Sequence, residues 1–194
     1  MRFHNTAGRN SLSVAVLEEL DSILSRLFAA ECSRAVIFTG VGDVFAAGAN
    51  IREVAQLDEV DAREFALRGQ SIFNKIALAA PLTVAAINGY CMGGGLDFAL
   101  ACDCRIASRQ ATFAHTGARL GIITGWGGTQ RLPALIGTSR ALEMFTTARH
   151  VTSDESLAYG LIDAIADPIL NAAIDFARRN SHPSRRQYWK QTRR

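Results

Sequence analysis

Apolar residues recur at helical spacing in two long segments of the chain. In residues 11–30 the apolar positions fall three or four residues apart, and charged residues occupy the opposite side. The spacing predicts a helix over Ser11–Ala30 whose apolar face consists of Leu12, Val16, Leu20, Ile23, Leu24 and Leu27. A second amphipathic pattern predicts a helix over Asp61–Leu78. Each helix is expected to bury one face and expose the other.

Short apolar runs bounded by glycine, proline or polar residues predict strands. They occur at Ala35–Thr39, Leu82–Ile87, Cys104–Ala107, Thr112–Ala114 and Leu161–Ala166. Further helices are predicted up to Ile136, over Ser139–Thr147 and from Pro168 to about Asn180, with loops at 40–43 and 121–128. Because helices and strands alternate, an α/β fold with a largely buried sheet is predicted. No linker divides residues 1–194, so a single domain is expected.

A glycine triplet separates one predicted strand from the helix that follows it. The segment NGYCMGGGLDFALACD, which begins at Asn88, places Gly93, Gly94 and Gly95 directly before an apolar helical run. Glycines at a helix start let a ligand approach the backbone, and the first N–H groups and the helix dipole favour negative charge there. Such a site suits a phosphate or a developing oxyanion. Because neither a P-loop ending nor GxGxxG spacing is present, the oxyanion site is the preferred interpretation.

Composition is that of an ordinary soluble globular protein. With 194 residues, of which 48% are hydrophobic and 20% charged, the chain is long enough to bury a substantial core. The longest uncharged run, Ile76–Leu96, contains a proline and several glycines and is interpreted as a strand and turn rather than a membrane span. The first ten residues lack the apolar core of a signal peptide, so a cytoplasmic location is expected.

The cysteines and the charge pattern refine this picture. Cys32, Cys91, Cys102 and Cys104 show no disulfide-rich or paired CxxC pattern and no metal-ligand spacing, so buried free thiols are favoured over a metal site. The net charge is +3, yet residues 176–194 carry seven Arg or Lys and no acid. This basic C-terminal segment could bind phosphate or nucleic acid, but a solvated helix end is the simpler interpretation.

Four segments carry a more specific signal when they are taken together. They are RNSLS (9–13), VIFTGVGDVFAAGANI (36–51), AAINGYCMGGGLDFALACDCRIAS (85–108) and LGIITGWGGTQRLPALIG (120–137). In this order and at these separations they resemble the crotonase (enoyl-CoA hydratase/isomerase) superfamily, in one register from about residue 5 to residue 190. Any one segment is a weak signal, whereas all four together are highly specific.

The resemblance implies a fold, a substrate class and an assembly. The fold would be a crotonase-like spiral of ββα turns with surrounding helices, in which residues 166–194 are a shortened C-terminal helical region. The substrate would be an acyl-coenzyme A thioester; coenzyme A is then part of the substrate, and no separate cofactor is expected. Trimers or dimers of trimers are implied, whereas neither a membrane nor a nucleic acid is an expected partner.

In this family two backbone N–H groups hold the thioester carbonyl as it becomes an enolate. By position in the sequence they belong to Ala49 and Gly94, which agrees with the oxyanion interpretation of the glycine triplet. The resemblance places coenzyme A contacts at Ala47, Asn50, Ile51 and Arg52. Arg52 falls where relatives often carry a lysine near the coenzyme A 3′-phosphate, and a solvent-facing arginine is the alternative.

The chain departs from the family at both catalytic glutamates. The first position is Asp97, whose carboxylate has a shorter reach and is expected to act as the general acid/base. An exposed aspartate favoured by the helix dipole is the alternative. The second position is Gly117, which has no carboxylate. Nearby His115, which could titrate near neutrality, is expected to be structural or to contact the catalytic residues without contacting the substrate.

A single carboxylate favours a double-bond shift or another enolate reaction over the addition of water. An enzyme of the enoyl-CoA hydratase/isomerase type is therefore expected. The missing glutamate also fits a degenerate relative that binds acyl-CoA without turnover. An RNA-binding relative is a weaker alternative, because only Tyr188 and Trp189 supply aromatic side chains in the basic C-terminal segment.

Overall fold

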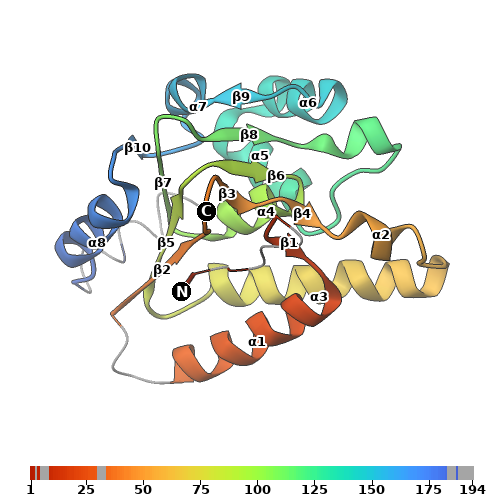
Figure 1. Cartoon of the computed structure of the whole chain (residues 1–194), viewed down its shortest axis with the longest axis horizontal. Coiled ribbons are helices and arrows are strands. Elements are labelled where there is room, and N and C mark those ends of the chain that lie inside the picture. The colour runs from red at the N-terminus through yellow and green to blue at the C-terminus, as the bar shows by residue number, and fades with distance from the viewer. Residues whose placement is uncertain (3, 5–8, 30–33, 183–186, 188–194) are drawn as a thin grey trace.

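The computed structural model describes residues 1–2, 4, 9–29, 34–182 and 187, in which strands and helices alternate (Figure 1). The strands are β1 (Ser11–Leu12), β2 (Ala35–Thr39), β3 (Val44–Ala46), β4 (Gly48–Ala49), β5 (Leu82–Ile87), β6 (Tyr90–Met92), β7 (Cys104–Ala107), β8 (Thr112–Ala114), β9 (Val151–Thr152) and β10 (Ala164–Ile165). The helices are α1 (Val14–Ala29), α2 (Ile51–Val54), α3 (Glu59–Ala77), α4 (Gly94–Ala101), α5 (Gly128–Ile136), α6 (Thr138–Thr147), α7 (Ser153–Tyr159) and α8 (Ile169–Asn180), with a 3-10 helix, η2, at Thr116–Leu120.

Two four-stranded sheets organise the fold (Figure 1). One has the order β10–β7–β5–β2 and is parallel. The other has the order β3–β6–β8–β9, with β8 and β9 antiparallel and the other pairs parallel. The chain passes from the first sheet to the second in each of the pairs β2–β3, β5–β6 and β7–β8, and a helical segment follows each pair. This is the predicted α/β spiral of ββα turns.

The sheet that contains β5 is buried on both faces, as predicted. All six residues of β5 are buried. Leu82, Val84 and Ala86 belong to an apolar cluster that includes residues of α8. Ala85 and Ile87 point the other way, into the main core. This two-sided burial explains why the segment reads as a continuous apolar run rather than an alternating one.

Helix α4 lies at the centre of the fold, and its residues from Gly95 to Ala101 are all buried. The ring of Phe98 packs against three other phenylalanine rings at centroid distances of 5.0, 5.7 and 5.5 Å: Phe38, Phe45 and Phe73. Each such aromatic pair contributes about 0.5–1.5 kcal/mol beyond the burial of its area. The packing fixes α4, and with it the glycine triplet at its start.

The first helix begins later than the sequence pattern predicts. Ser11 and Leu12 form β1, which pairs with β4. Ser13 then caps α1, because its hydroxyl accepts a hydrogen bond from the N–H of Val16 at 3.2 Å. Leu12 is buried in this strand. Leu12 therefore fits the helical spacing of apolar residues although it lies in a strand.

The strand predicted over Leu161–Ala166 is also shorter, and only β10 remains. The N–H of Leu161 donates to the carbonyl of Ser156 at 2.8 Å, directly after Gly160, which has a φ of +76°. This bond closes the C-terminal turn of α7. The first residues of the apolar run are therefore used to end a helix.

The sequence pattern does not predict α7, β6 or β9. Helix α7 nevertheless carries a local signal, because Thr152 and Glu155 form a capping box. The N–H of Glu155 donates to the Thr152 hydroxyl at 3.3 Å, and the N–H of Thr152 donates to the Glu155 carboxylate at 3.0 Å. Strands β6 and β9 are two or three residues long and depend on partners elsewhere in the sheet.

Candidate active site

A cavity of about 630 Å³ opens beside the glycine triplet, between the α2–α3 segment, η2, the loop after it and α6. Its wall is mostly apolar and includes Ile51, Val54, Leu57, Phe65, Ile122 and Phe145. Cavities of this size and character commonly hold small-molecule ligands. This cavity is the candidate active site.

Ala49 and Gly94, the two predicted N–H donors, both line this cavity. Their backbones lie close together, since a β-carbon built on Gly94 would be 3.5 Å from the nitrogen of Ala49. The N–H of the next residue, Asn50, donates to β1 at 3.4 Å, and successive N–H groups of a strand point to opposite sides. Gly94 is the first residue of α4, so its N–H has no intrahelical partner. The backbones of Ala49 and Gly94 therefore lie side by side at the cavity wall.

The three glycines of the triplet are required for different reasons. Gly93 has a φ of +51°, which side-chain-bearing residues rarely adopt. A β-carbon on Gly94 would lie 2.3 Å from Cζ3 of Trp126, and one on Gly95 would lie 2.3 Å from the carbonyl oxygen of Ala46. The expected reason, ligand access to bare backbone, is therefore incomplete, because the protein's own atoms also fill the space beside the second and third glycines.

The four residues expected to contact coenzyme A surround the start of α2. Ala47 and Ile51 line the cavity, and Ile51 is 55% exposed. Asn50 instead caps α2: its side-chain oxygen accepts a hydrogen bond from the N–H of Arg52 at 3.2 Å, and its amide donates to Glu53 at 2.9 Å. Arg52 is exposed and is not among the described residues that line the cavity. The side chain of Asn50 is thus engaged by the protein itself.

Asp97 lies in the first turn of α4 and is fully buried, so the alternative of an exposed aspartate is wrong. Its Oδ2 accepts a hydrogen bond from the hydroxyl of Thr124. Burial raises the pKa of Asp97 to about 7, against smaller opposing effects of which the Thr124 hydrogen bond is the largest. Near neutral pH the carboxyl group can therefore hold or release a proton. Asp97 is not itself among the described residues that line the cavity.

His115 follows β8 and lies between the cavity and Asp97. Its Nε2 is 3.6 Å from Oδ1 of Asp97, and its ring packs on that of Phe145 with a centroid distance of 4.7 Å. Burial lowers the pKa of His115 to about 4. The distance would suit an ion pair, but burial favours the neutral form of both groups, so the imidazole is neutral at pH 7.

The position of the second family glutamate, Gly117, has no room for a side chain. A β-carbon there would lie 2.4 Å from the carbonyl oxygen of Ile122. The N–H of Ile122 also donates to the carbonyl of Gly117 at 3.1 Å, which holds the two backbones together. The loss of the carboxylate is therefore accompanied by a turn that a longer residue could not adopt unchanged.

The shifted pKa values of Asp97 and His115 affect stability in opposite directions. The pKa of Asp97 is raised from 3.8 to about 7 on folding, so its contribution to stability is fully present below 3.8 and is lost as pH rises through about 7. The pKa of His115 is lowered from 6.5 to about 4, so its contribution is present above 6.5 and is lost as pH falls through about 4. Between these limits the two effects largely cancel.

Single variants are expected to expose each effect. Between pH 4 and 6.5 the free energy of unfolding should rise with pH in Asp97→Asn and fall with pH in His115→Gln, by about 1 kcal/mol per pH unit in each case. Denaturant titrations at several pH values measure these slopes. Slopes of the same sign in the two variants would contradict the opposite shifts.

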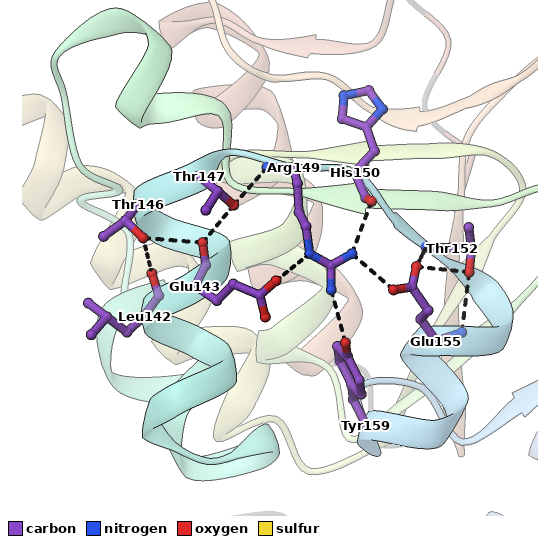
Figure 2. A network of polar contacts seen from close by, with 9 residues as sticks. All are labelled: Leu142, Glu143, Thr146, Thr147, Arg149, His150, Thr152, Glu155 and Tyr159. Atoms are coloured by element: carbon purple, nitrogen blue, oxygen red, sulfur yellow. Dashed lines mark hydrogen bonds and ion pairs between the residues drawn. The ribbon is translucent and has the colours of Figure 1, made fainter.

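Glu143 of α6 and Glu155 of α7 bind an arginine, Arg149, and do not line the cavity. Arg149 donates from Nε to Glu143 at 2.6 Å, from Nη1 to Glu155 at 2.9 Å and from Nη2 to the hydroxyl of Tyr159 at 2.9 Å (Figure 2). This network ties α6 to α7. Because α6 also carries Phe145, the network supports the wall of the cavity from outside.

Two residues that shape the site lie in the loop over 121–128, where the sequence pattern indicates only a glycine-rich connection. Thr124 lines the cavity and hydrogen-bonds Asp97. Trp126 packs over Gly94, and its indole N–H donates to the carbonyl of Phe65 at 3.2 Å. For Trp126, the available signal in the sequence was a tryptophan between glycines. For Thr124, no local sequence pattern indicates the contact with Asp97.

Other expectations concern features outside the cavity. Cys91, Cys102 and Cys104 are buried, as predicted, whereas Cys32 lies outside the described residues. Most of the basic residues of the C-terminal segment also lie outside them. Among the helices that the structure describes, none has the length and apolar character needed to cross a membrane.

Known sequences resemble this chain over most of its length. The model of a family described as enoyl-CoA hydratase/isomerase matches residues 1–188. The chain is 36% identical to the short-chain-enoyl-CoA hydratase of Clostridium acetobutylicum over 87% of its length. It is 37% identical to the crotonyl-CoA hydratase of Syntrophomonas wolfei over 82% of its length. It spans 66% and 62%, respectively, of these two curated relatives.

Solved structures with similar folds cover nearly the whole chain. The enoyl-CoA hydratase of Bacillus anthracis is 38% identical, with a TM-score of 0.87 over 92% of this chain and 70% of that one. DspI of Pseudomonas aeruginosa is 33% identical, with a TM-score of 0.90 over 96% of this chain and 79% of that one. The predicted crotonase-like fold is thereby confirmed.

Proposed function

Because the chain belongs to the enoyl-CoA hydratase/isomerase family, we propose that it acts on an acyl-CoA thioester through an enolate held by the backbone N–H groups of Ala49 and Gly94. The observation that carries the proposal is the approach of these two backbone segments at the wall of an apolar cavity. The acyl group would lie against the apolar wall, with its carbonyl oxygen between the two donors. Loss of one such donor typically raises the barrier by about 3 kcal/mol.

Asp97 is the proposed acid/base group of this site. Removal of the α-proton requires a group that accepts it near neutral pH, and burial brings the pKa of Asp97 to about 7. Since the carboxyl group lies behind the cavity wall, a proton passes between it and the substrate through a side chain of that wall.

A double-bond shift fits the site better than the addition of water. Hydratases of the family use two glutamates, whereas this chain has Gly117 at the second position and no carboxylate among the described residues of the cavity wall. A double-bond shift removes the α-proton and returns a proton to the γ-carbon, which a single acid/base group can do. Isomerisation, or another reaction of the enolate, is therefore the proposed chemistry.

The test follows crotonyl-CoA and a 3-enoyl-CoA with the purified protein, by absorbance and by mass spectrometry. The expected result is conversion of the 3-enoyl-CoA at unchanged mass. A mass gain of one water on crotonyl-CoA would instead establish hydration. Binding of both thioesters with no change in either, over a wide range of enzyme concentration, would identify a binding protein and contradict the proposed activity.

Family membership also leads us to propose the assembly and the location of the protein. Homotrimers or dimers of trimers are proposed, and the cytoplasm is the proposed compartment. Sedimentation equilibrium of the full chain tests the assembly, and a purely monomeric species at micromolar concentration would contradict it.

A further inference from the structure

His115 is the one titratable side chain among the described residues that line the cavity. The remaining wall is aliphatic, aromatic or hydroxyl-bearing, and the indole N–H of Trp126 is already donated to a backbone carbonyl. Asp97 contacts two side chains of this wall, His115 and Thr124. A proton that moves between Asp97 and a bound ligand therefore crosses the wall at one of these two residues.

The surroundings of His115 leave both of its ring nitrogens available. The side chain is 3% exposed, yet neither Nδ1 nor Nε2 has a hydrogen-bond partner among the described residues. The facing atom, Oδ1 of Asp97, has no side-chain hydrogen-bond partner among the described residues, and the backbone of Trp126 and Gly128 lies near the same carboxyl group. Buried polar atoms are almost always paired in folded proteins, and leaving them unpaired is costly. Two unpaired ring nitrogens would be costly in a purely structural histidine. A histidine that exchanges protons with a bound ligand requires a ring nitrogen that the protein leaves unpaired.

We propose that His115 is the catalytic residue that carries the proton between bound acyl-CoA and Asp97, and that Asp97 both positions the imidazole and takes up the proton. This inference rests on the proposed function and names the group that completes it. The roles of the two nitrogens follow from the geometry, because Nε2 faces Asp97 at 3.6 Å and Nδ1 is the nitrogen left for the ligand.

The proposed step is balanced within the site. The Cα–H bond of the thioester breaks and its electron pair becomes the enolate, whose oxygen is held by Ala49 and Gly94. The proton forms a new N–H bond at Nδ1 of His115, and the proton on Nε2 is shared with, or passes to, Asp97. Return of a proton from His115 to the γ-carbon of an enolate that carries a double bond completes the shift without any co-reactant.

The other group that could carry a proton through the cavity wall is the hydroxyl of Thr124, which donates to Oδ2 of Asp97. A threonine hydroxyl does not titrate near neutral pH and can only pass a proton on. An imidazole accepts one proton while holding another, which suits a residue between a substrate carbon and a carboxylate. The geometry therefore favours His115.

The ionisation of Asp97 should appear in the pH dependence of the step. Arg131 on α5 is the charged group that favours ionised Asp97, and the thiol of Cys91 on β6 stays protonated because burial raises its pKa well above 9.0. Burial raises the pKa of Asp97 to about 7, so proton exchange should increase as pH rises through about 7. This increase should disappear in Asp97→Asn.

The test is exchange of the α-protons of butyryl-CoA with D2O, followed by mass spectrometry. Butyryl-CoA has no double bond to hydrate or shift, so its exchange reports proton transfer alone. His115→Gln and His115→Asn are expected to bind butyryl-CoA and to exchange about 10²–10⁴-fold more slowly. Free imidazole should restore exchange to His115→Ala. The matched control is His150→Gln, at an exposed histidine outside the cavity, which should exchange at the wild-type rate.

Each other outcome decides against the inference. Exchange retained in both His115 variants would overturn it and leave the proposed function intact. Exchange lost in Thr124→Val but retained in the His115 variants would assign the crossing to Thr124. Equal losses of binding and exchange in the His115 variants, without rescue by imidazole, would make His115 structural. A wild-type protein that binds butyryl-CoA without any exchange would overturn the proposed function itself.

Discussion

Replacement of Gly94 by alanine is expected to slow exchange of the α-protons of bound acyl-CoA about 100-fold. The new β-carbon would lie 2.3 Å from Cζ3 of Trp126, so either the indole ring or the start of α4 must move. The ring has little freedom, because it packs against Phe65 and Phe73 at centroid distances of 5.1 and 5.6 Å and donates a hydrogen bond to the backbone. The displacement therefore falls on the N–H of Gly94, and a misplacement of about 1 Å can cost about 100-fold in rate.

Gly69→Ala is the matched control for this variant. A β-carbon on Gly69 would lie 2.2 Å from Cδ1 of the same Trp126 ring, but Gly69 is on α3 and is not among the described residues of the cavity wall. Both variants overpack the ring and should lose about 1–3 kcal/mol of unfolding free energy. Only Gly94→Ala should also lose proton exchange. Equal losses of exchange in the two variants would show that the ring, and not the N–H of Gly94, is responsible.

Arg105→Met is expected to reduce the free energy of unfolding by about 3–5 kcal/mol. Arg105 on β7 is 2% exposed. Its Nε donates to the carbonyl of Leu161 and its Nη1 to that of Cys102, each at 2.8 Å, and its Nη2 lies 3.8 Å from the carboxylate of Asp163. Methionine fills part of the same volume but removes every one of these interactions. Removal of one partner from a buried ion pair leaves an uncompensated charge, which is the source of the large cost.

Arg109→Met provides the comparison for this loss. The Arg109 side chain is 70% exposed and lies 3.5 Å from an exposed partner, Asp154. Such surface pairs contribute about 0–1 kcal/mol, so this variant should unfold close to the wild type. Denaturant titration of both variants measures the difference. A loss below about 1 kcal/mol in Arg105→Met would contradict a structural role for the buried guanidinium.

Helices and strands whose buried residues follow a local spacing of apolar positions were predictable from the sequence. The strand at Ala35–Thr39 has the predicted limits, and the helix predicted at Asp61–Leu78 is α3, shifted by one or two residues. Strand β1 and the limits of β10 were not, because hydrogen bonds to distant segments decide where such strands begin and end. The capping box of α7 is a local signal that the apolar pattern alone misses.

Some features of the candidate site were likewise predictable from the sequence, and others were not. The sequence places Ala49 and Gly94 through their motifs, and the structure brings their backbones together. The sequence does not reveal that Asp97 is buried behind the cavity wall, because an aspartate in a first helical turn has the same local pattern whether it is exposed or enclosed. Apolar residues on every side of α4 were the available signal for burial. The contact between Asp97 and His115 depends on how α4 and β8 pack.

The central claim is that the backbone at Ala49 and Gly94 stabilises an enolate oxygen, and acetoacetyl-CoA tests it most directly. The acidic α-protons of this thioester allow its enolate to form without chemistry at other positions, and the enolate is visible by near-ultraviolet absorbance. We expect binding to the wild-type protein to produce the enolate band at a pH where the free thioester is in its keto form, and we expect Gly94→Ala to weaken the band. Acetoacetyl-CoA that is bound in the keto form, with no enolate band across the pH range in which the protein is folded, would contradict the account.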